Sequence, residues 1–163
     1  MNNEQMQQIV ELIAARLLAR INNALTLSQE ELRHASAMAH FLTHDTLYVQ
    51  QTDICFLRQL AEGDQDNTAV AHLFEALTLG MQVTVSINSR LLPCLPLSEL
   101  ANLPLALRDE HGSCITHCKK KVLSYRDIVG LKGGWLVTSR KTIITVLARE
   151  ALAAQHIRLV KQA

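Results

Sequence analysis

The segment WLVTSRKTIITVLAREALAAQHIRLV, residues 135–160, decides the fold. Its ends are short β-rich runs, Trp135-Leu136-Val137 and Ile157-Arg158-Leu159-Val160, and residues 141–155 between them favour a helix. A strand, a helix and a second strand in this order predict a crossover unit. Because crossovers of this kind are right-handed, we expect the two strands to be parallel neighbours.

The same alternation of short strands and helices extends upstream to about residue 46. A first strand is predicted at Leu47-Tyr48-Val49, and another where Met81, Val83, Val85 and Ile87 alternate with polar residues. The stretches that favour helices are Ile54–Ala61 and Thr68–Leu79, the second of them stopped by Gly80. The pattern predicts an α/β fold, a single Rossmann-like domain with a mainly parallel sheet.

An inserted β-hairpin is predicted within this domain. Leu105-Ala106-Leu107 and Cys114–Cys118 flank the turn residues 109–113, which favours an antiparallel pair. Before it, Leu91–Leu103 predicts a short helix with Pro93 and Pro96 near its start. After it, Ser124 and Asp127 have capping-box spacing and predict another short helix.

The N-terminus predicts a separate amphipathic helix over residues 4–21. Its apolar residues recur at three- and four-residue steps and form a stripe about 120° wide: Met6, Ile9, Val10, Ile13, Leu17 and Ile21. Gln7, Gln8 and Glu11 take the opposite side.

The organisation that follows has three parts. Residues 1–21 form the helix, residues 22–29 are a short polar linker, and residues 30–163 form the α/β domain. Ser28 with Glu31 is a capping box that predicts a helix from about residue 29 to residue 41.

Composition bounds the function. The chain has 163 residues, 48% of them hydrophobic, with 16 Lys and Arg against 15 Asp and Glu. The formal net charge of +1 gives no indication of a basic surface that would bind nucleic acid, and the run Lys119–Lys121 is too short to change that. The first residues lack a signal peptide and a membrane span, and the four irregularly spaced cysteines are expected to be reduced thiols. We therefore expect a soluble cytosolic protein.

Two His and two Cys form the most suggestive cluster for a metal: His111, Cys114, His117 and Cys118. If the segment is a strand, the two Cys lie on one face and the two His on the other, so one ion cannot collect all four. His40 and His44 share a helical spacing, but capping and surface roles explain them better. We predict no metal, no cofactor and no catalytic residues.

Gly130, Gly133 and Gly134 precede a strand, so they fit a turn and match neither nucleotide-binding motif. The segment Thr138–Thr142 lies between a strand and a helix, where Arg140 and Lys141 could help to hold an anion. A helix cap by Ser139 explains the same residues more simply.

Several segments carry a family resemblance. The motifs that carry it in the C-terminal third are residues 123–129, 134–138, 147–151 and 157–160. The resemblance continues upstream in residues 76–87, 91–92 and 103–105. Together they resemble the propanediol-utilisation microcompartment protein M (PduM) family. These are packing and turn motifs without a reactive signature.

The resemblance implies a component of bacterial microcompartments, the protein-shelled bodies of the cytosol that confine pathways such as propanediol breakdown. It implies a non-enzymatic role in assembly, with shell proteins or core enzymes as partners; a homo-oligomer also fits, and neither nucleic acid nor a membrane is expected. The N-terminal helix is similar to encapsulation peptides, which makes its apolar stripe the candidate partner-binding site: Met6, Ile9, Val10, Ile13 and Leu17. Packing of this helix on its own domain is the open alternative.

A second hypothesis belongs to a different class. A small-molecule or cofactor-binding protein, or an enzyme of the same pathway, would use a crevice at the carboxyl ends of the parallel strands. The residues expected there are Thr138–Thr142 and Ser86–Arg90.

Overall fold

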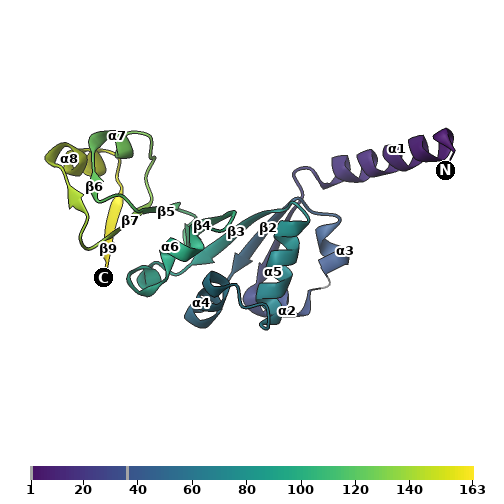
Figure 1. Ribbon diagram of the computed structural model, residues 1–163, viewed down its shortest axis with the longest axis horizontal. Helices are drawn as coiled ribbons and strands as arrows, with labels where there is room; N and C mark the ends of the chain where they lie inside the picture. Colours follow the sequence, from purple (N-terminus) through teal and green to yellow (C-terminus); the bar gives the residue numbers. More distant parts are fainter. Residues whose placement is uncertain (1, 36) are drawn as a thin grey trace.

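The computed structural model describes residues 2–35 and 37–163. It consists of an N-terminal helix and two lobes, which we call the first lobe (residues 22–113) and the second lobe (residues 114–163) (Figure 1). The lobes share one hydrophobic core at their junction, because Ile115 and Val137 of the second lobe belong to the core cluster of the first.

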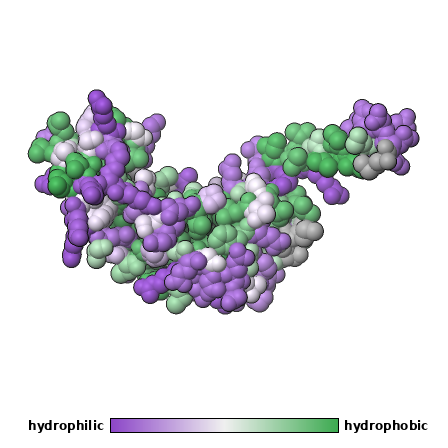
Figure 2. Space-filling view, in the orientation of Figure 1, coloured by the Kyte–Doolittle hydropathy of each residue, from purple (hydrophilic) through white to green (hydrophobic). Residues whose placement is uncertain are grey.

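Helix α1 (Asn3–Arg20) agrees with the predicted helix at residues 4–21, and it projects from the first lobe (Figure 1). Figure 2 shows hydrophobic side chains over the middle of the helix and hydrophilic ones at its N-terminal end. Its base is held by polar contacts: the Arg20 Nε donates to the carbonyl of His44 at 3.1 Å, and the backbone N–H of Asn22 donates to the Asp45 carboxylate at 2.8 Å. The helix is thus fixed to the first lobe at one end.

The predicted linker at residues 22–29 is corrected by the structure, because strand β1 (Ala24–Ser28) lies there. It pairs in parallel with β2 (Thr46–Gln50). Leu25 and Leu27 are half-buried against the core, while the residues between them face away. This is the period-two pattern of an edge strand, and two leucines among polar residues are a weak signal for it.

The first sheet has the order β1-β2-β3-β4 and is parallel throughout. Its other strands are β3 (Gln82–Ile87) and β4 (Leu105–Asp109). The helices of this lobe are α2 (Gln29–His34), α3 (Ala37–Phe41), α4 (Ile54–Glu62), α5 (Thr68–Thr78), the 3-10 helix η1 (Ser89–Cys94) and α6 (Leu97–Leu100). The predicted helix at 29–41 is therefore two short helices.

The helices of the first lobe cover one face of this sheet. Each strand is followed along the chain by its neighbour in the sheet, so right-handed crossovers place every connection on the same side. The strand residues buried against the helices alternate with exposed ones such as Tyr48, Gln50 and Arg108. A Rossmann-like sheet carries helices on both faces, so this α/β sheet is parallel as predicted but is not doubly wound.

The second lobe contains the crossover that residues 135–160 predict. Strands β7 (Trp135–Ser139) and β9 (Arg158–Gln162) are parallel neighbours, and α8 (Val146–Ala154) connects them. The helix begins later than predicted, because residues 143–144 form a strand. The remaining elements are β5 (Ile115–Cys118), β6 (Val122–Leu123), α7 (Tyr125–Ile128) and β8 (Ile143–Ile144), which give the sheets β5-β7-β9 and β6-β8.

The inserted hairpin is also corrected. Strands β4 and β5 lie in different sheets and meet only at an isolated antiparallel bridge between Arg108 and Cys114. The chain does reverse between them, but β4 extends the sheet of the first lobe while β5 pairs in parallel with β7. Partners distant in sequence therefore decide both strands, and the local pattern does not reveal them.

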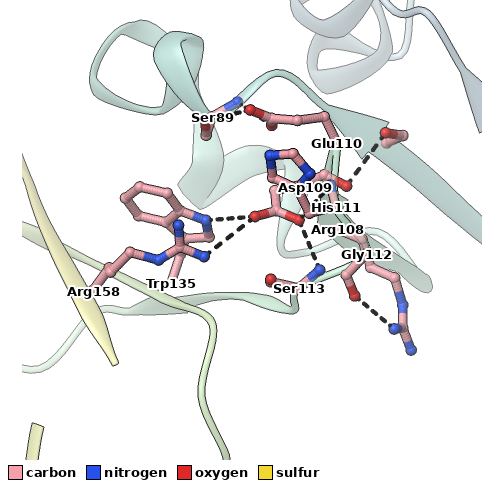
Figure 3. Close-up of polar contacts among 10 residues, drawn as sticks. Ser89, Arg108, Asp109, Glu110, His111, Gly112, Ser113, Trp135 and Arg158 are labelled. Atoms are coloured by element: carbon pink, nitrogen blue, oxygen red, sulfur yellow. Dashed lines mark hydrogen bonds and ion pairs between the residues drawn. The ribbon is translucent and has the colours of Figure 1, made fainter. Parts of the chain in front are cut away.

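Asp109, at the end of β4, connects the two lobes (Figure 3). Its Oδ1 accepts hydrogen bonds from the backbone N–H groups of His111 at 2.9 Å and Ser113 at 2.7 Å. Its Oδ2 accepts one from the Trp135 Nε1 at 2.9 Å and lies 3.5 Å from an Arg158 nitrogen. The Arg158 guanidinium stacks on the Trp135 ring at 4.1 Å from its centroid. One buried carboxylate thus fixes the turn and binds residues of β7 and β9.

We predict that this carboxylate stabilises the fold above acid pH. Burial raises the pKa of Asp109, but the hydrogen bonds from Trp135, Ser113 and His111 outweigh burial and hold the pKa below its usual value. The stabilisation is then present above the unfolded pKa, about 3.9, and is lost as pH falls through the lower folded pKa. Asp109→Ala should cost about 3 kcal/mol in urea unfolding at pH 7, because buried donors lose their acceptor. A difference from the parent that stays constant from pH 6 down to the acid transition would contradict this account.

A second prediction concerns the turn before β7. Gly134 has φ +85°, and a Cβ there would collide with the carbonyl oxygen of Cys114, whereas Gly133 has φ +64° with open space around it. Gly133→Ala, the matched control, should cost about 1 kcal/mol from backbone strain alone. Gly134→Ala should lower the free energy of unfolding by clearly more than this, as measured by thermal unfolding. Equal losses for the two variants would show that the close approach to Cys114 is unimportant.

Candidate interaction surfaces

The five predicted partner-binding residues lie exposed on α1. Met6, Ile9, Val10, Ile13 and Leu17 have 45–58% of their surface accessible. None of the described residues of α1 is buried. The alternative in which this face packs on its own domain is therefore not the arrangement seen here, and the apolar stripe is open to solvent.

The apolar surface of α1 is wider than the predicted stripe. Leu12 and Leu18 are also exposed, at 64% and 68%. At 100° per residue they lie outside the stripe, which is why periodicity alone did not select them. The same geometry places Arg16 beside the stripe and Glu4 and Glu11 on the opposite side. The face that a partner would meet is thus apolar with a positive edge.

A hollow of about 570 Å³ continues this surface at the base of the helix. Arg16 and Ala19 of α1 line one side of it. Ala39, Leu42 and Thr43, in and after α3, line another. A helix or loop that lay along α1 would also meet this part of the first lobe.

Only one half of the predicted ligand crevice exists as expected. Ser86 and Asn88, at the carboxyl end of β3, line a hollow of about 320 Å³ together with residues 50–52 and Glu110. Glu110 is fixed there by the Ser89 backbone N–H at 2.8 Å and by the Ser89 hydroxyl at 2.7 Å (Figure 3). The chain therefore places a polar crevice at the ends of β2 and β3, as open parallel sheets commonly do.

The other half, Thr138–Thr142, lies in the second lobe and does not line this crevice. Thr138 and Thr142 are buried, and the Thr142 hydroxyl donates to the carbonyl of Lys120 at 3.0 Å. The expected cap by Ser139 is wrong as well, because α8 begins only at Val146 and is capped by Thr145. An anion site built on that helix start with Arg140 and Lys141 is thereby excluded.

The His and Cys candidates do not form a metal site in the part of the chain that the structure describes. No group of three or more His, Cys, Asp or Glu side chains there is placed to hold an ion. His111 and Cys114 are exposed in the turn and after it, whereas His117 and Cys118 lie on β5. The His44 ring nitrogen Nδ1 lies 2.7 Å from the carbonyl of His40, which agrees with a capping role.

None of the helices in residues 2–35 and 37–163 combines the length and apolar character that crossing a bilayer requires. A helix with an open apolar side, mounted on an α/β body, defines a protein suited to contacts with other proteins.

Comparisons with known proteins identify the family. Residues 8–158 match the family model described as putative propanediol utilisation. The chain is 40% identical over 162 residues to the bacterial microcompartment assembly protein PduM of Citrobacter freundii, and 41% identical over 162 residues to the protein of that name from Salmonella typhimurium strain LT2, each match covering 99% of both chains. The chain belongs to this propanediol-utilisation family, which confirms the resemblance seen in the sequence. No solved structure matches it.

His117 allows a test of the region once considered for metal. Burial lowers the pKa of His117, with Lys119 acting in the same direction, and the buried Nδ1 atom has no hydrogen-bond partner among the described residues. A depressed folded pKa means that this group favours folding above its unfolded pKa, about 6.5, and that the benefit is lost as pH falls through the folded pKa. His117→Leu should therefore raise the free energy of unfolding more at pH 5 than at pH 8, by up to about 1 kcal/mol in urea unfolding.

The matched control is His111→Leu, which removes an exposed imidazole. Comparison with His117→Leu separates the effect of losing any imidazole from the effect of losing the buried one. A zinc-dependent rise in the melting temperature of the parent that His117→Leu abolishes would contradict the assignment of His117 as a structural residue.

Proposed function

We propose that this protein is a non-enzymatic assembly component of a propanediol-utilisation microcompartment in the bacterial cytoplasm, and that it organises shell proteins or core enzymes through protein–protein contacts. The observation that carries the proposal is the open apolar side of α1. The names of its relatives, which are assembly proteins of bacterial microcompartments, support the same role.

Helix α1 is suited to insertion into a groove. With 18 residues it is about 27 Å long. Its apolar side chains are spaced at i, i+3, i+4 and i+7, as in helices that bind grooves. Full burial of one such side chain contributes about 1.5 to 3 kcal/mol. Even half of that from five residues offsets a large part of the entropy lost on association.

The chemistry of the helix also defines its partner. Arg16 lies beside the apolar stripe and has no ion pair among the described residues, whereas Arg20 is engaged with the His44 carbonyl. We expect an apolar groove with an acidic residue on one edge. The lobes remain free to hold another component, so that α1 and the body join two parts of the assembly.

We predict that Ile9→Glu with Ile13→Glu leaves the melting temperature within about 2 °C of the parent, because surface substitutions typically change stability by no more than about 0.5 kcal/mol. The same variant should fail to co-purify with microcompartments, because two charges would enter an apolar groove. The measurements are calorimetry on the pure protein and quantitative mass spectrometry of isolated compartments.

The matched control is Gln8→Glu with Ala15→Glu, which adds the same two charges on the opposite side of α1. It should co-purify like the parent. A large drop in melting temperature for the first variant would place the face in the domain core, and unchanged co-purification would remove α1 from the function.

The second hypothesis, a small-molecule-binding protein, is favoured by the crevice at the ends of β2 and β3. Its amide, hydroxyl and carboxylate groups fit a neutral, hydroxyl-bearing molecule. Saturating 1,2-propanediol should then raise the melting temperature of the parent but leave that of Ser86→Leu unchanged. Equal behaviour of both proteins would dismiss this alternative.

A further inference from the structure

The two lobes carry opposite charge. Residues 22–113 contain eleven Asp and Glu against four Arg, a formal charge of −7, whereas residues 114–163 contain ten Lys and Arg against two acids, a formal charge of +8. The helix residues 3–20 hold two Glu and two Arg and are neutral, so the total returns the net charge of +1. The small net charge therefore conceals a strongly dipolar molecule.

The positive charge of the second lobe is available to a partner. All ten of its Lys and Arg side chains are exposed. Within the described residues only Lys120 and Arg158 form ion pairs, with Asp127 and Asp109. The other eight cations have no acid within ion-pair distance in the same part of the chain.

An exposed aliphatic cluster lies among these cations. Val122 and Ile143 are register partners in the small β6-β8 sheet, and Val146 and Leu147 begin α8 directly after it. Their exposed fractions run from 49% to 75%. Figure 2 shows hydrophobic surface on the second lobe as well as on α1. We call these four residues the basic knob, together with the cationic residues that flank them along the chain: Lys121, Arg140, Lys141 and Arg149.

A complementary surface lies on the first lobe. A hollow of about 320 Å³ is lined by Leu27 and Ala35, with Glu30 and Glu31 and two histidines, His34 and His40, around them. We call it the acidic hollow. It lies beside β1, one edge of the first sheet, whereas β4 at the other edge leads into the second lobe. Figure 1 places α2 and α3 at the end of the first lobe away from the second lobe, so knob and hollow lie at opposite ends of the body.

We propose that the basic knob of one copy docks in the acidic hollow of a second copy, head to tail. The two surfaces are complementary: the knob offers aliphatic side chains with a cationic surround, and the hollow offers an apolar lining with the carboxylates of Glu30 and Glu31. Glu30 also pairs with Arg33 and His34 of its own helix, and a docked cation would compete with them. The two cannot meet within one molecule, because the first sheet separates them. A nucleic acid would neutralise the cations but leave the aliphatic cluster uncovered, and the −7 charge of the first lobe would repel it.

The contact is heterologous, since it joins two different surfaces of the same chain. Repeated head to tail it produces a ring if the rotation closes and an open chain if it does not. Its electrostatic part should weaken steeply with salt, because the screening length falls from about 10 Å at 0.1 M to about 3 Å at 1 M.

The experiment uses the full-length protein and analytical ultracentrifugation with two variants. Glu30→Lys with His34→Lys blocks the hollow, and Ile143→Asn with Val146→Gln blocks the knob; all four side chains are exposed. The parent should self-associate with rising concentration at low salt, and 1 M salt should reverse this. Each variant alone should remain monomeric at concentrations where the parent associates.

An equimolar mixture of the two variants should form a 1:1 dimer and stop there, because one intact knob and one intact hollow remain. The matched control, Leu12→Gln with Leu18→Gln, removes exposed apolar surface from α1 and should associate like the parent.

A parent that stays monomeric at low salt, or variants that self-associate like the parent, would overturn the proposal. A monomeric parent that binds an RNA oligonucleotide would assign the basic lobe to nucleic acid instead. The Ile9 and Ile13 variant should self-associate normally, so this result is independent of the function proposed for α1.

Discussion

The carboxylate of Asp109 is the constraint on which the rest of the structure depends. It lies where the last strand of the first sheet ends, and in one position it closes a turn, accepts from the Trp135 indole and approaches Arg158. These partners come from different strands of the second lobe. This buried anion, whose hydrogen bonds outweigh the cost of its burial, therefore helps to set the relative placement of the lobes, together with the shared core at Ile115 and Val137 and the hydrogen bonds from Gln162 to the carbonyls of Leu92 and Leu95.

The connection order explains why so much of this small protein is available for contact. Parallel sheets usually have helices on both faces. Here each crossover steps to the next strand in the same direction, and all helices fall on one side. Threonine, serine, glutamine and arginine side chains occupy much of the other face beside Tyr48, so the surface that this face presents to water is mainly polar. Its exposed apolar residues are gathered mainly on α1 and the second lobe.

Local chemistry could be predicted well from the sequence. The capping pair Ser28 and Glu31 starts α2, the left-handed Gly80 follows α5, and the strand-helix-strand unit at residues 135–160 has the expected parallel register. The predictions that were wrong concern strands whose pairing partners are distant in the sequence. Strand β1 is defined by pairing with β2 across a 17-residue gap, and β4 and β5 separate because each finds a better neighbour elsewhere.

The surfaces show the same division. The apolar stripe of α1 could be found from periodicity, but its exposure could not, because periodicity does not say whether a stripe meets its own domain. The crevice near Ser86 followed from the rule for parallel strands. The prediction for Thr138–Thr142 was wrong because β3 and β7 lie in different sheets, where a single sheet was expected. The charge asymmetry was present in the sequence all along and disappeared only when the charges were summed over the whole chain.

Polar contacts hold α1 at its base, so a small change of angle there is amplified at its N-terminal tip. It is held near Arg20 and Asn22, and none of its described residues is buried in either lobe. For a rigid helix about 27 Å long, a tilt of about 10° at the base moves the tip by about 5 Å. A partner that tilted the helix in this way would carry the apolar stripe with it and leave the core of the first lobe in place.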